Sequence, residues 1–538
     1  MVDPLRPDWP HCGHGADPTT NPVGCRGVHV PGHTACLVHL TDSDRATYLA
    51  ELGPGASIDH SGTILDKPLL RSLLDACRDT DTEECRLGTA TFDGATFIGD
   101  ALFDWVNFTD DASFLGATFT GNAWFDWATF TGNAQFNAAT FTANASFQGT
   151  TFTGEGVWFK SVRFERISHF GPLVCQEKID LSGTFFEAPV TVEIAAPEVS
   201  CVRTRWESTA TLRLRYATVD LDAAVLSSLV AVTAHPAPFT IDFLGLAVEV
   251  DENTVARFTD GDSGVRIASV TGVDAAHLVL TDTDLTDCRF TGAFRLDQLR
   301  LEGNCKFAEP PKRQRWTQRR VLAEEHHWRA LTTRDPAPPR GWTRGPHHPD
   351  RSLTPGPKQL APAYRALRKA TEDAKNEPDA ADFYYGEMEM RRHDRDRPWG
   401  ERALLSLYWA ISGYGLRASR ALTGLLVAMG LTVVLLMMVG LPAQPAVQRI
   451  TGTVTGGQTV ALTTRAPAPR GTPPGAWVDR FSWRRAERAA RTAVNSVVFR
   501  SAGQGLTLPG TYIEMASRVA EPVLLALVLL ALRGRVKR

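Results

Sequence analysis

The sequence predicts a mixed fold, in which a solenoid of short β-strands with a square coil precedes α-helices that include hydrophobic segments. Two observations predict this fold: phenylalanine recurs at steps of five and six residues near the N-terminus, and a charge-free apolar stretch of bilayer length lies near the C-terminus. A chain of 538 residues is also too long for one ordinary hydrophobic core, so we expect two or more domains.

The phenylalanine series defines a repeat of eleven residues. Three consecutive units read ATFTGNAWFDW, ATFTGNAQFNA and ATFTANASFQG. This spacing fits neither the i, i+3, i+4, i+7 pattern of an amphipathic helix nor the strict alternation of a flat strand. The phenylalanines of the series, which we predict to be structural core, are Phe92, Phe97, Phe103, Phe108, Phe114, Phe119, Phe125, Phe130, Phe136, Phe141, Phe147 and Phe152.

A chain that turns a corner every five or six residues, with one large side chain pointing inward per edge, satisfies this spacing. Four edges close a square coil of about 22 residues, and successive coils then stack at the strand spacing of about 4.8 Å. Phe92 should therefore stack on Phe114, and Phe114 on Phe136. The alanine two residues before each phenylalanine fits a second, tighter inward position, while Gly, Asn, Thr and Asp suit the corners.

These residues resemble the pentapeptide-repeat family in its phenylalanine-centred form, whose fold is a right-handed quadrilateral β-helix. The resemblance is strong over residues 89–170, weakens near Trp206, Leu212 and Leu214, and returns over residues 280–290. A β-helix over residues 88–306 would hold roughly ten coils. Some members of the family resemble a DNA rod in shape and charge and bind type II topoisomerases.

The charge of the repeat region does not favour a DNA-like role. Residues 86–306 contain 28 acidic and 15 basic residues, a net charge of −13, whereas residues 307–420 carry a net charge of +7. Residues 89–159 hold seven acids and no Lys or Arg, far below the duplex density of one charge per ~1.7 Å. We therefore expect a solvated acidic face and no nucleic-acid partner.

A cluster of cysteines and histidines lies near the N-terminus. Cys12, Cys25, Cys36 and His39 follow the pattern C-x12-C-x10-C-x2-H. The last two form the short chelating pair typical of structural zinc sites, whereas the first two do not. A segment with so few core-forming residues would need a metal to fold, so structural zinc is the cofactor that this pattern suggests. The alternative is that these residues are ordinary free thiols and surface histidines.

A second run of metal-binding residue types is Glu324-Glu-His-His327, which lacks the HExxH spacing of a metalloprotease. On a helix these four neighbours point around the whole circumference, so we do not expect them to share a metal.

The C-terminal part predicts a membrane region. Residues 421–441 are 21 residues without a charge, which is the length that a bilayer requires. Residues 519–532 form a shorter apolar segment that ends in a basic tail, so it either crosses the membrane or lies in its interface. The seven arginines ahead of the first segment place its N-terminal side in the cytoplasm: Arg391, Arg392, Arg395, Arg397, Arg402, Arg417 and Arg420.

Two crossings would leave both chain ends in the cytoplasm, with the protein in a bacterial inner membrane. The N-terminus lacks a secretory signal pattern, and the nine scattered cysteines fit a reducing compartment. The expected organisation is a Cys/His-rich segment (1–45), a helical lead-in (46–87), the β-helix (88–306), a helix and Pro/Arg-rich linker (307–357), a cytosolic helical hairpin region (358–416) and the membrane region (417–538).

The whole layout is similar to that of bacterial membrane-bound pentapeptide-repeat proteins, and this resemblance implies no particular activity. The sequence shows no nucleophile–base pair, phosphate loop or paired catalytic acids, so we predict a non-enzymatic scaffold, anchored in membrane lipid, with a protein partner on the β-helix. The alternative is an oligomeric pore gated by the β-helix, because the order of span, Gly-containing loop and span is similar to a two-helix potassium-type channel. Its loop lacks the TVGYG-like filter, and Arg500 would oppose a cation there.

Overall fold

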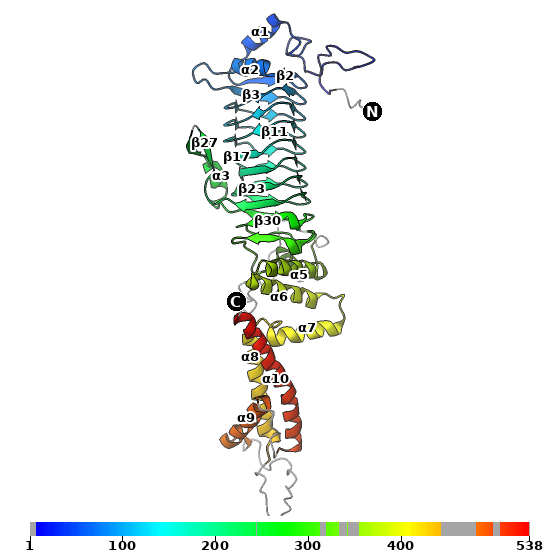
Figure 1. Ribbon diagram of the computed structural model, residues 1–538, viewed down its shortest axis with the longest axis vertical. Coiled ribbons are helices and arrows are strands. Elements are labelled where there is room, and N and C mark those ends of the chain that lie inside the picture. Colours follow the sequence, from blue (N-terminus) through cyan, green and yellow to red (C-terminus); the bar gives the residue numbers. More distant parts are fainter. Residues whose placement is uncertain are drawn as a thin grey trace, which may run out of the picture. The chain divides into compact units, whose positions relative to one another are not determined.

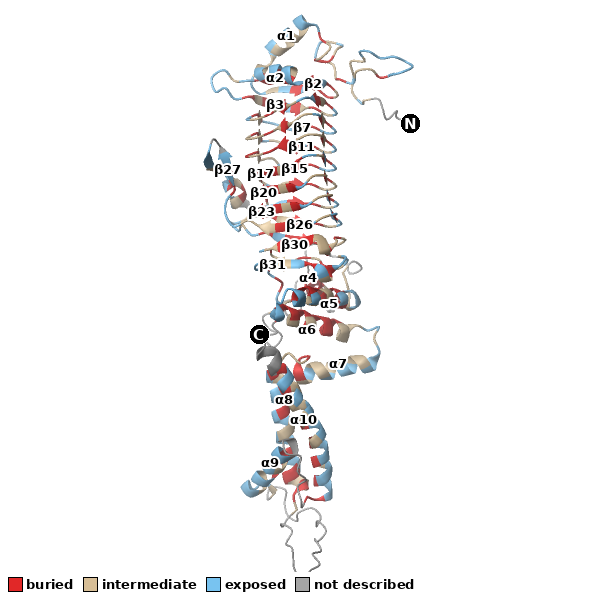
Figure 2. Cartoon of the chain, viewed as in Figure 1, coloured by how far each residue is buried: buried red, intermediate tan, exposed pale blue. Residues whose placement is uncertain are grey.

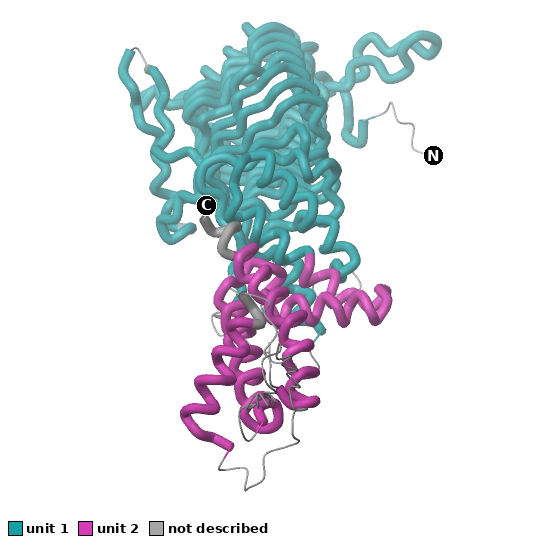
Figure 3. The backbone as a smooth tube through the Cα atoms, turned by 60° about the horizontal axis from the view of Figure 1, so that its bottom comes forward, with its two compact units in different colours: residues 1–387 teal, residues 388–538 magenta. Residues whose placement is uncertain are grey.

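The computed structural model describes residues 7–243, 245–311, 319–332, 342, 354–442, 480–498 and 506–536. It divides into two compact units, residues 1–387 and residues 388–538, which are coloured separately in Figure 3. The predicted filter-type loop, residues 499–505, and almost all of the predicted linker, residues 334–353 except Trp342, lie outside the described residues.

The first unit is built around a β-solenoid that runs from β3 (Arg86–Thr91) to β31 (Arg300–Glu302). Its strands pair in parallel with the strands of the next coil, as Figure 1 shows, and the stack holds about ten coils. The square coil that the phenylalanine spacing predicts is therefore confirmed.

The strands of the coils form three parallel sheets, and the largest extends over more than one face because β3 pairs with two strands of the next coil. The largest sheet contains 18 strands: β1 (Ala56–Asp59), β3, β6 (Asn107–Phe108), β7 (Ala112–Ser113), β10 (Thr129–Phe130), β11 (Ala134–Gln135), β14 (Thr151–Phe152), β15 (Val157–Trp158), β17 (His169–Cys175), β18 (Lys178–Asp180), β20 (Val190–Ala195), β21 (Glu198–Ser200), β23 (Ala210–Arg215), β24 (Thr218–Asp220), β26 (Val230–Ala234), β29 (Arg266–Ser269), β30 (Leu278–Thr281) and β31. The second contains eight: β2 (Ile64–Asp66), β4 (Thr96–Ile98), β8 (Thr118–Phe119), β12 (Thr140–Phe141), β16 (Arg163–Phe164), β19 (Phe185–Phe186), β22 (Arg205–Trp206) and β25 (Val225–Leu226). The third contains β5 (Ala101–Leu102), β9 (Ala123–Trp124) and β13 (Ala145–Ser146).

Stacked phenylalanine rings fill the first coils. The rings of Phe92 and Phe114 are 5.3 Å apart, and those of Phe114 and Phe136 are 4.9 Å apart, as the sequence predicts. The predicted inward alanines, such as Ala123, are fully buried. Figure 2 shows the resulting column of buried residues inside the coils. This packing excludes the phenylalanines from any ligand site, because every ring of the series is core.

Corner residues with positive φ recur once per coil in two columns. One column contains Trp105 and Trp127, whose indole rings stack 5.3 Å apart. Gly149 follows them with a φ of 70°, and a Cβ there would lie 2.7 Å from the Trp127 ring. The glycine that follows the two tryptophans at this corner is therefore a packing requirement.

Acidic side chains link neighbouring coils. A carboxylate oxygen of Asp111 accepts a hydrogen bond from the Asn133 amide at 2.8 Å, and Asp126 does the same for Gln148 at 2.8 Å. Asp93 likewise accepts hydrogen bonds from Ser113 and from the Leu115 amide. Part of the acidic series thus serves as bridges between coils.

The repeat changes after Phe164. Up to β19, residues that pair between neighbouring coils are 22 or 23 positions apart in the sequence, as in the pairs β12–β16 and β16–β19. Beyond it the interval is 20 residues, because Phe185 pairs with Arg205 and Arg205 with Val225. The longer strands β17, β20, β23 and β26 replace one corner of each coil in this part. Aliphatic side chains take over the core there, which explains why the phenylalanine pattern fades although the coils continue.

The chain leaves the stack once, between β26 and β29. This excursion contains the antiparallel hairpin of β27 (Thr240–Phe243) and β28 (Leu246–Glu249), followed by α3 (Asn253–Phe258). A buried ion pair of 2.7 Å between Arg215 and Glu252 fastens it to the solenoid.

Helices flank both ends of the solenoid. Before it lie α1 (Asp42–Glu51) and α2 (Lys67–Ala76), and short 3-10 turns, η1 (Ala275–His277) and η2 (Leu296–Gln298), lie in the last coils. After it come α4 (Ala323–Leu331), α5 (Pro357–Asp373) and α6 (Glu377–His393). Glu387 of α6 bonds to Arg365 and Arg368 of α5, so these two helices form the predicted hairpin.

The second unit contains α7 (Trp399–Ser412), α8 (Ala418–Leu435) with a π-helical last turn η5 (Leu436–Gly440), α9 (Trp483–Val498) and α10 (Leu508–Val536). Helices α8 and α10 pack along each other, and the Thr432 hydroxyl donates to Glu521 at 2.7 Å. Arg485 of α9 donates to the carbonyl oxygens of Met437, Leu441 and Pro442, at the end of the α8–η5 segment.

Among the described helices, only the segment Ala418–Gly440 is long and apolar enough to cross a membrane. It coincides with the first predicted span. The second predicted segment, residues 519–532, lies within α10, which also carries Glu514, Arg518 and Glu521, and the described residues of α10 do not meet that criterion. Two crossings therefore stay a prediction.

Candidate metal centre

The four predicted metal ligands converge in the N-terminal lobe, residues 7–40. Cys12 and Cys25 lie on two segments that run antiparallel, because the Cys12 amide donates to the Gly27 carbonyl at 2.8 Å and the Gly13 amide to the Cys25 carbonyl at 2.9 Å. Cys36 and His39 lie in one tight turn, closed by a 2.9 Å bond from the His39 amide to the Cys36 carbonyl. The long interval between Cys12 and Cys25 is thus a hairpin that places them side by side.

The spacing of the donor atoms matches a tetrahedral zinc site. All four lie within 4.8 Å of one another. The sulfurs of Cys25 and Cys36 are 3.6 Å apart, and Nδ1 of His39 lies 3.6 Å from the Cys12 sulfur and 3.3 Å from the Cys36 sulfur. With Zn–S near 2.3 Å and Zn–N near 2.0 Å, a tetrahedron requires S–S edges of about 3.8 Å and S–N edges of about 3.5 Å. Three cysteines and one histidine are also a usual donor set for structural zinc.

Burial shifts the protonation of two groups in the cluster. Burial raises the pKa of the Cys36 thiol to about 12, so this thiol needs a nearby cation to ionise at neutral pH. Burial, with a smaller contribution from His14, lowers the pKa of His39, which favours the neutral imidazole that binds metals. Ionisation of the thiols on binding would make metal affinity rise with pH.

Neighbouring residues hold the ligands in place. A Cβ on Gly27 would lie 2.7 Å from the Cys36 Cβ and 2.9 Å from its sulfur, so only glycine permits this approach. Arg45 of α1 donates to the carbonyl oxygens of Leu37, Val38 and Leu40, which fixes the turn that carries Cys36 and His39. The His14 ring stacks on the His39 ring with centroids 4.1 Å apart. Neither Gly27 nor Arg45 is marked by the Cys/His pattern, so sequence reasoning missed both.

The lobe joins the solenoid through backbone contacts. The Val28 amide donates to the Ser61 carbonyl at 2.8 Å, just before β2. A Cβ on Gly62 would lie 2.4 Å from the Arg26 carbonyl oxygen, which shows how closely the two chains approach. The Cys/His cluster therefore lies in a lobe that abuts the first coil.

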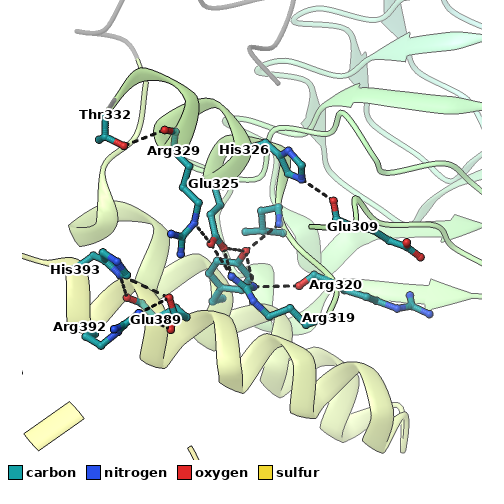
Figure 4. Close-up of polar contacts among 12 residues, drawn as sticks. Glu309, Arg319, Arg320, Glu325, His326, Arg329, Thr332, Glu389, Arg392 and His393 are labelled. Atoms are coloured by element: carbon teal, nitrogen blue, oxygen red, sulfur yellow. Dashed lines mark hydrogen bonds and ion pairs between the residues drawn. The ribbon is translucent and has the colours of Figure 1, made fainter. Parts of the chain in front are cut away.

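The residues Glu324 to His327 do not share a site, as the sequence predicts. Glu324 accepts hydrogen bonds from the Phe290 and Thr291 amides at 2.7 and 2.8 Å, and His326 lies 2.9 Å from the Glu309 carbonyl. Glu325 forms ion pairs with Arg319 and Arg329, each at 2.6 Å (Figure 4).

The Glu325 network is structural. Burial would raise the pKa of this carboxyl, but Arg319 and Arg329 outweigh burial and hold it at about 2. Tyr364 of α5 also donates to Glu325 at 2.5 Å, so the network ties α4 to the helical hairpin. A permanently ionised, fully paired carboxylate has no spare capacity for acid–base chemistry.

Comparison with known families identifies the repeat of the first coils. Residues 83–126 match a family model described as pentapeptide repeats, nine copies. The solenoid contains pentapeptide repeats. The match ends at residue 126, well before β31. The phenylalanine coils continue beyond it to Phe164, and only then do the coils shorten to 20 residues and aliphatic side chains replace phenylalanine. Neither the curated proteins nor the solved structures include a match to this chain.

The four donors suit a structural metal site better than a catalytic one. Four protein donors would fill a tetrahedral zinc and leave no position for water or substrate, as catalytic zinc requires. Within the described part of the chain this cluster is the single group of three or more Cys, His, Asp or Glu residues placed to hold a metal. When bound, zinc would supply cross-linking of the hairpin and the Cys36–His39 turn.

Proposed function

We propose that this protein is a non-enzymatic scaffold that is anchored in a membrane, with a structural zinc lobe at the start of its pentapeptide-repeat solenoid. The observation that carries the proposal is the uninterrupted stack of about ten coils in a chain that also holds one helix of membrane-spanning length. The solenoid would present a long, regular surface to a protein partner in the cytoplasm.

The solenoid supports this role because its phenylalanines fill the interior, so that only its outward side chains can contact a partner. All phenylalanines of the repeat are buried, and several acids are committed to bridges between coils. Solenoids in which each coil contacts only its neighbours commonly bind partners along such an extended surface. The described residues offer a structural metal cluster and a fully paired buried carboxylate, and neither arrangement supports turnover of a substrate.

Helix α8 supports the anchor. Leu426, Val427 and Leu431 point their side chains out of the unit and are more than half exposed, which in water would be a costly apolar surface. In a bilayer the same side chains would contact lipid chains. The arginines ahead of α8 favour a cytoplasmic N-terminal side.

The anchor can be tested by fractionation. The full-length protein should stay with membranes after alkaline carbonate extraction, whereas Leu426→Arg/Leu431→Arg should release it, because each arginine at a span centre costs about 2.5–3.5 kcal/mol. Leu246→Arg, on the exposed hairpin of the excursion, is the matched control and should remain in the membrane fraction. Release of the unsubstituted protein by carbonate would refute the anchor.

The scaffold role can be tested with a photo-crosslinking amino acid placed in cells at exposed positions of successive coils, such as Leu115, Gln135 and Lys160. A bound partner should crosslink from one face at several coils, in a consistent order along the partner's sequence. Crosslinks that scatter over all faces without a recurrent product would contradict a scaffold.

A further inference from the structure

Helix α7 carries an exposed apolar stripe. Trp399 is 82% exposed, Leu404 66% and Leu407 56%. Ala403 and Ala410 are exposed between and beyond them, so the five residues follow the i, i+4, i+5, i+8 and i+11 positions of one helix face. A soluble helix normally buries such a face, and this one has no cover among the described residues of its unit. We call these five residues the α7 stripe.

The remaining faces of α7 carry the polar and cationic contacts. The Arg392 guanidinium lies over the Trp409 ring at 4.5 Å and that of Arg420 at 5.2 Å. Arg402 donates to the Arg392 carbonyl, and Arg397 pairs with Glu401 at 2.6 Å. Residues 388–420 hold seven arginines and four acids, a net charge of +3. The apolar stripe of α7 is therefore flanked by arginines of the same helix and of neighbouring segments.

Helix α7 directly precedes the candidate span, which indicates what the stripe contacts. The helix ends at Ser412, Gly413 takes a left-handed conformation as its cap, and α8 begins at Ala418. Figure 1 shows α7 running across the direction of α8. If α8 stands across a bilayer, a helix that leaves its N-terminal end in this way lies along the membrane surface.

We infer that α7 lies in the plane of the membrane surface, with the α7 stripe in the acyl boundary and the surrounding arginines at the phosphates of anionic phospholipids. This inference rests on the proposed membrane anchor. Interfacial helices of this composition sit about 5–10 Å into the boundary between headgroups and acyl chains. Tryptophan favours that depth, and arginines near it attract anionic headgroups.

The test uses the full-length protein in vesicles of phosphatidylcholine and phosphatidylglycerol that contain brominated phosphatidylcholine. The Trp399 signal is the difference in fluorescence between the natural protein and Trp399→Phe, whose exposed site tolerates the change. Bromines near the headgroup should quench this signal about twofold, and bromines near the chain end should quench it less, given the shallow depth of such helices. Vesicles of phosphatidylcholine alone should give weaker quenching.

A matched pair of variants isolates the stripe. Leu404→Glu/Leu407→Glu should abolish quenching of Trp399 while carbonate extraction still leaves the protein in the membrane. Leu229→Glu/Leu246→Glu, which changes two exposed leucines of the solenoid unit, should leave the quenching unchanged.

Two outcomes would overturn the inference, and extraction distinguishes them. A membrane-integral protein whose Trp399 is not quenched would show that the stripe faces a second copy or a protein partner, and the anchor would stand. Release of the protein by carbonate, together with unquenched Trp399, would refute the anchor as well.

Discussion

At the scale of single residues, Asp104 stands out among the outward acids of the solenoid. Burial, and then the nearby Asp126, raise the pKa of the Asp104 carboxyl to about 6 from an ordinary value of 3.8. The folded protein thus binds a proton at Asp104 more tightly than the unfolded chain does. Stability is therefore lost as pH rises from about 4 through 6, and the full cost is present at neutral pH.

Replacing this carboxyl with an amide should remove the cost. Asp104→Asn should raise the urea midpoint of the full-length protein at pH 7.5 and change it little below pH 4, where both states are protonated. Glu155→Gln, an exposed neutralisation in the same solenoid, is the control and should leave both midpoints unchanged. An equal gain at both pH values would show that the ionisation of Asp104 is not the cause.

At the scale of elements, the inward alanines set the tightness of each coil. Ala123 is fully buried and pairs with Ala101 before it and Ala145 after it. Ala123→Leu should therefore destabilise the solenoid by about 1–3 kcal/mol through overpacking, measured by chemical unfolding followed by far-UV circular dichroism. The outward Gln135→Leu adds a similar side chain without internal crowding and should shift the transition by less than ~0.5 kcal/mol. Equal effects of the two substitutions would contradict the tight inward position.

The early coils could be predicted from sequence because each coil repeats the same side chains at the same interval. The stacking of Phe92, Phe114 and Phe136 follows directly from that period. The continuation of the solenoid to residue 306 was also predicted, but its change to a 20-residue coil was not, since alternating residues such as Val190, Val192 and Ile194 resemble an ordinary strand. Their pairing is visible only once neighbouring coils are in register.

The metal cluster was predictable as a set of residues but not as a geometry. The Cys36–His39 pair is local, so its spacing already indicates a turn that chelates. Cys12 and Cys25 come together through a backbone hairpin with its turn at Asp17–Asn21, and the spacing of the two cysteines alone does not specify that pairing. The α7 stripe was missed for a different reason: Trp399, Leu404 and Leu407 have helical spacing, and only the structure shows that this face is left exposed.

At the scale of the whole molecule, the zinc lobe and the solenoid should respond separately to metal removal. With zinc bound, the lobe would depend on its cluster, whereas each coil is held by its neighbours. Treatment with a zinc chelator should release one zinc per chain and open residues 12–39 to protease, with no loss of β-structure in the circular dichroism spectrum.

A pair of single substitutions provides the control for this experiment. Cys36→Ser should reproduce the protease sensitivity without chelator, and His33→Ala, in the same lobe but outside the cluster, should not. Retention of full zinc content by Cys36→Ser would contradict the assigned ligand set. Loss of β-structure on addition of chelator would show that the solenoid needs the folded lobe for its stability.

The excursion between β26 and β29 has a practical consequence. The chain departs from the stack and returns in register, so that β24 still pairs with β29 and β26 with β30. The number of residues in the excursion therefore does not affect the stacking of the coils on either side of it. The exposed turn at Gly245 is accordingly a suitable site for domain insertion. A fluorescent reporter or a foreign binding domain could be inserted there while the solenoid stays intact.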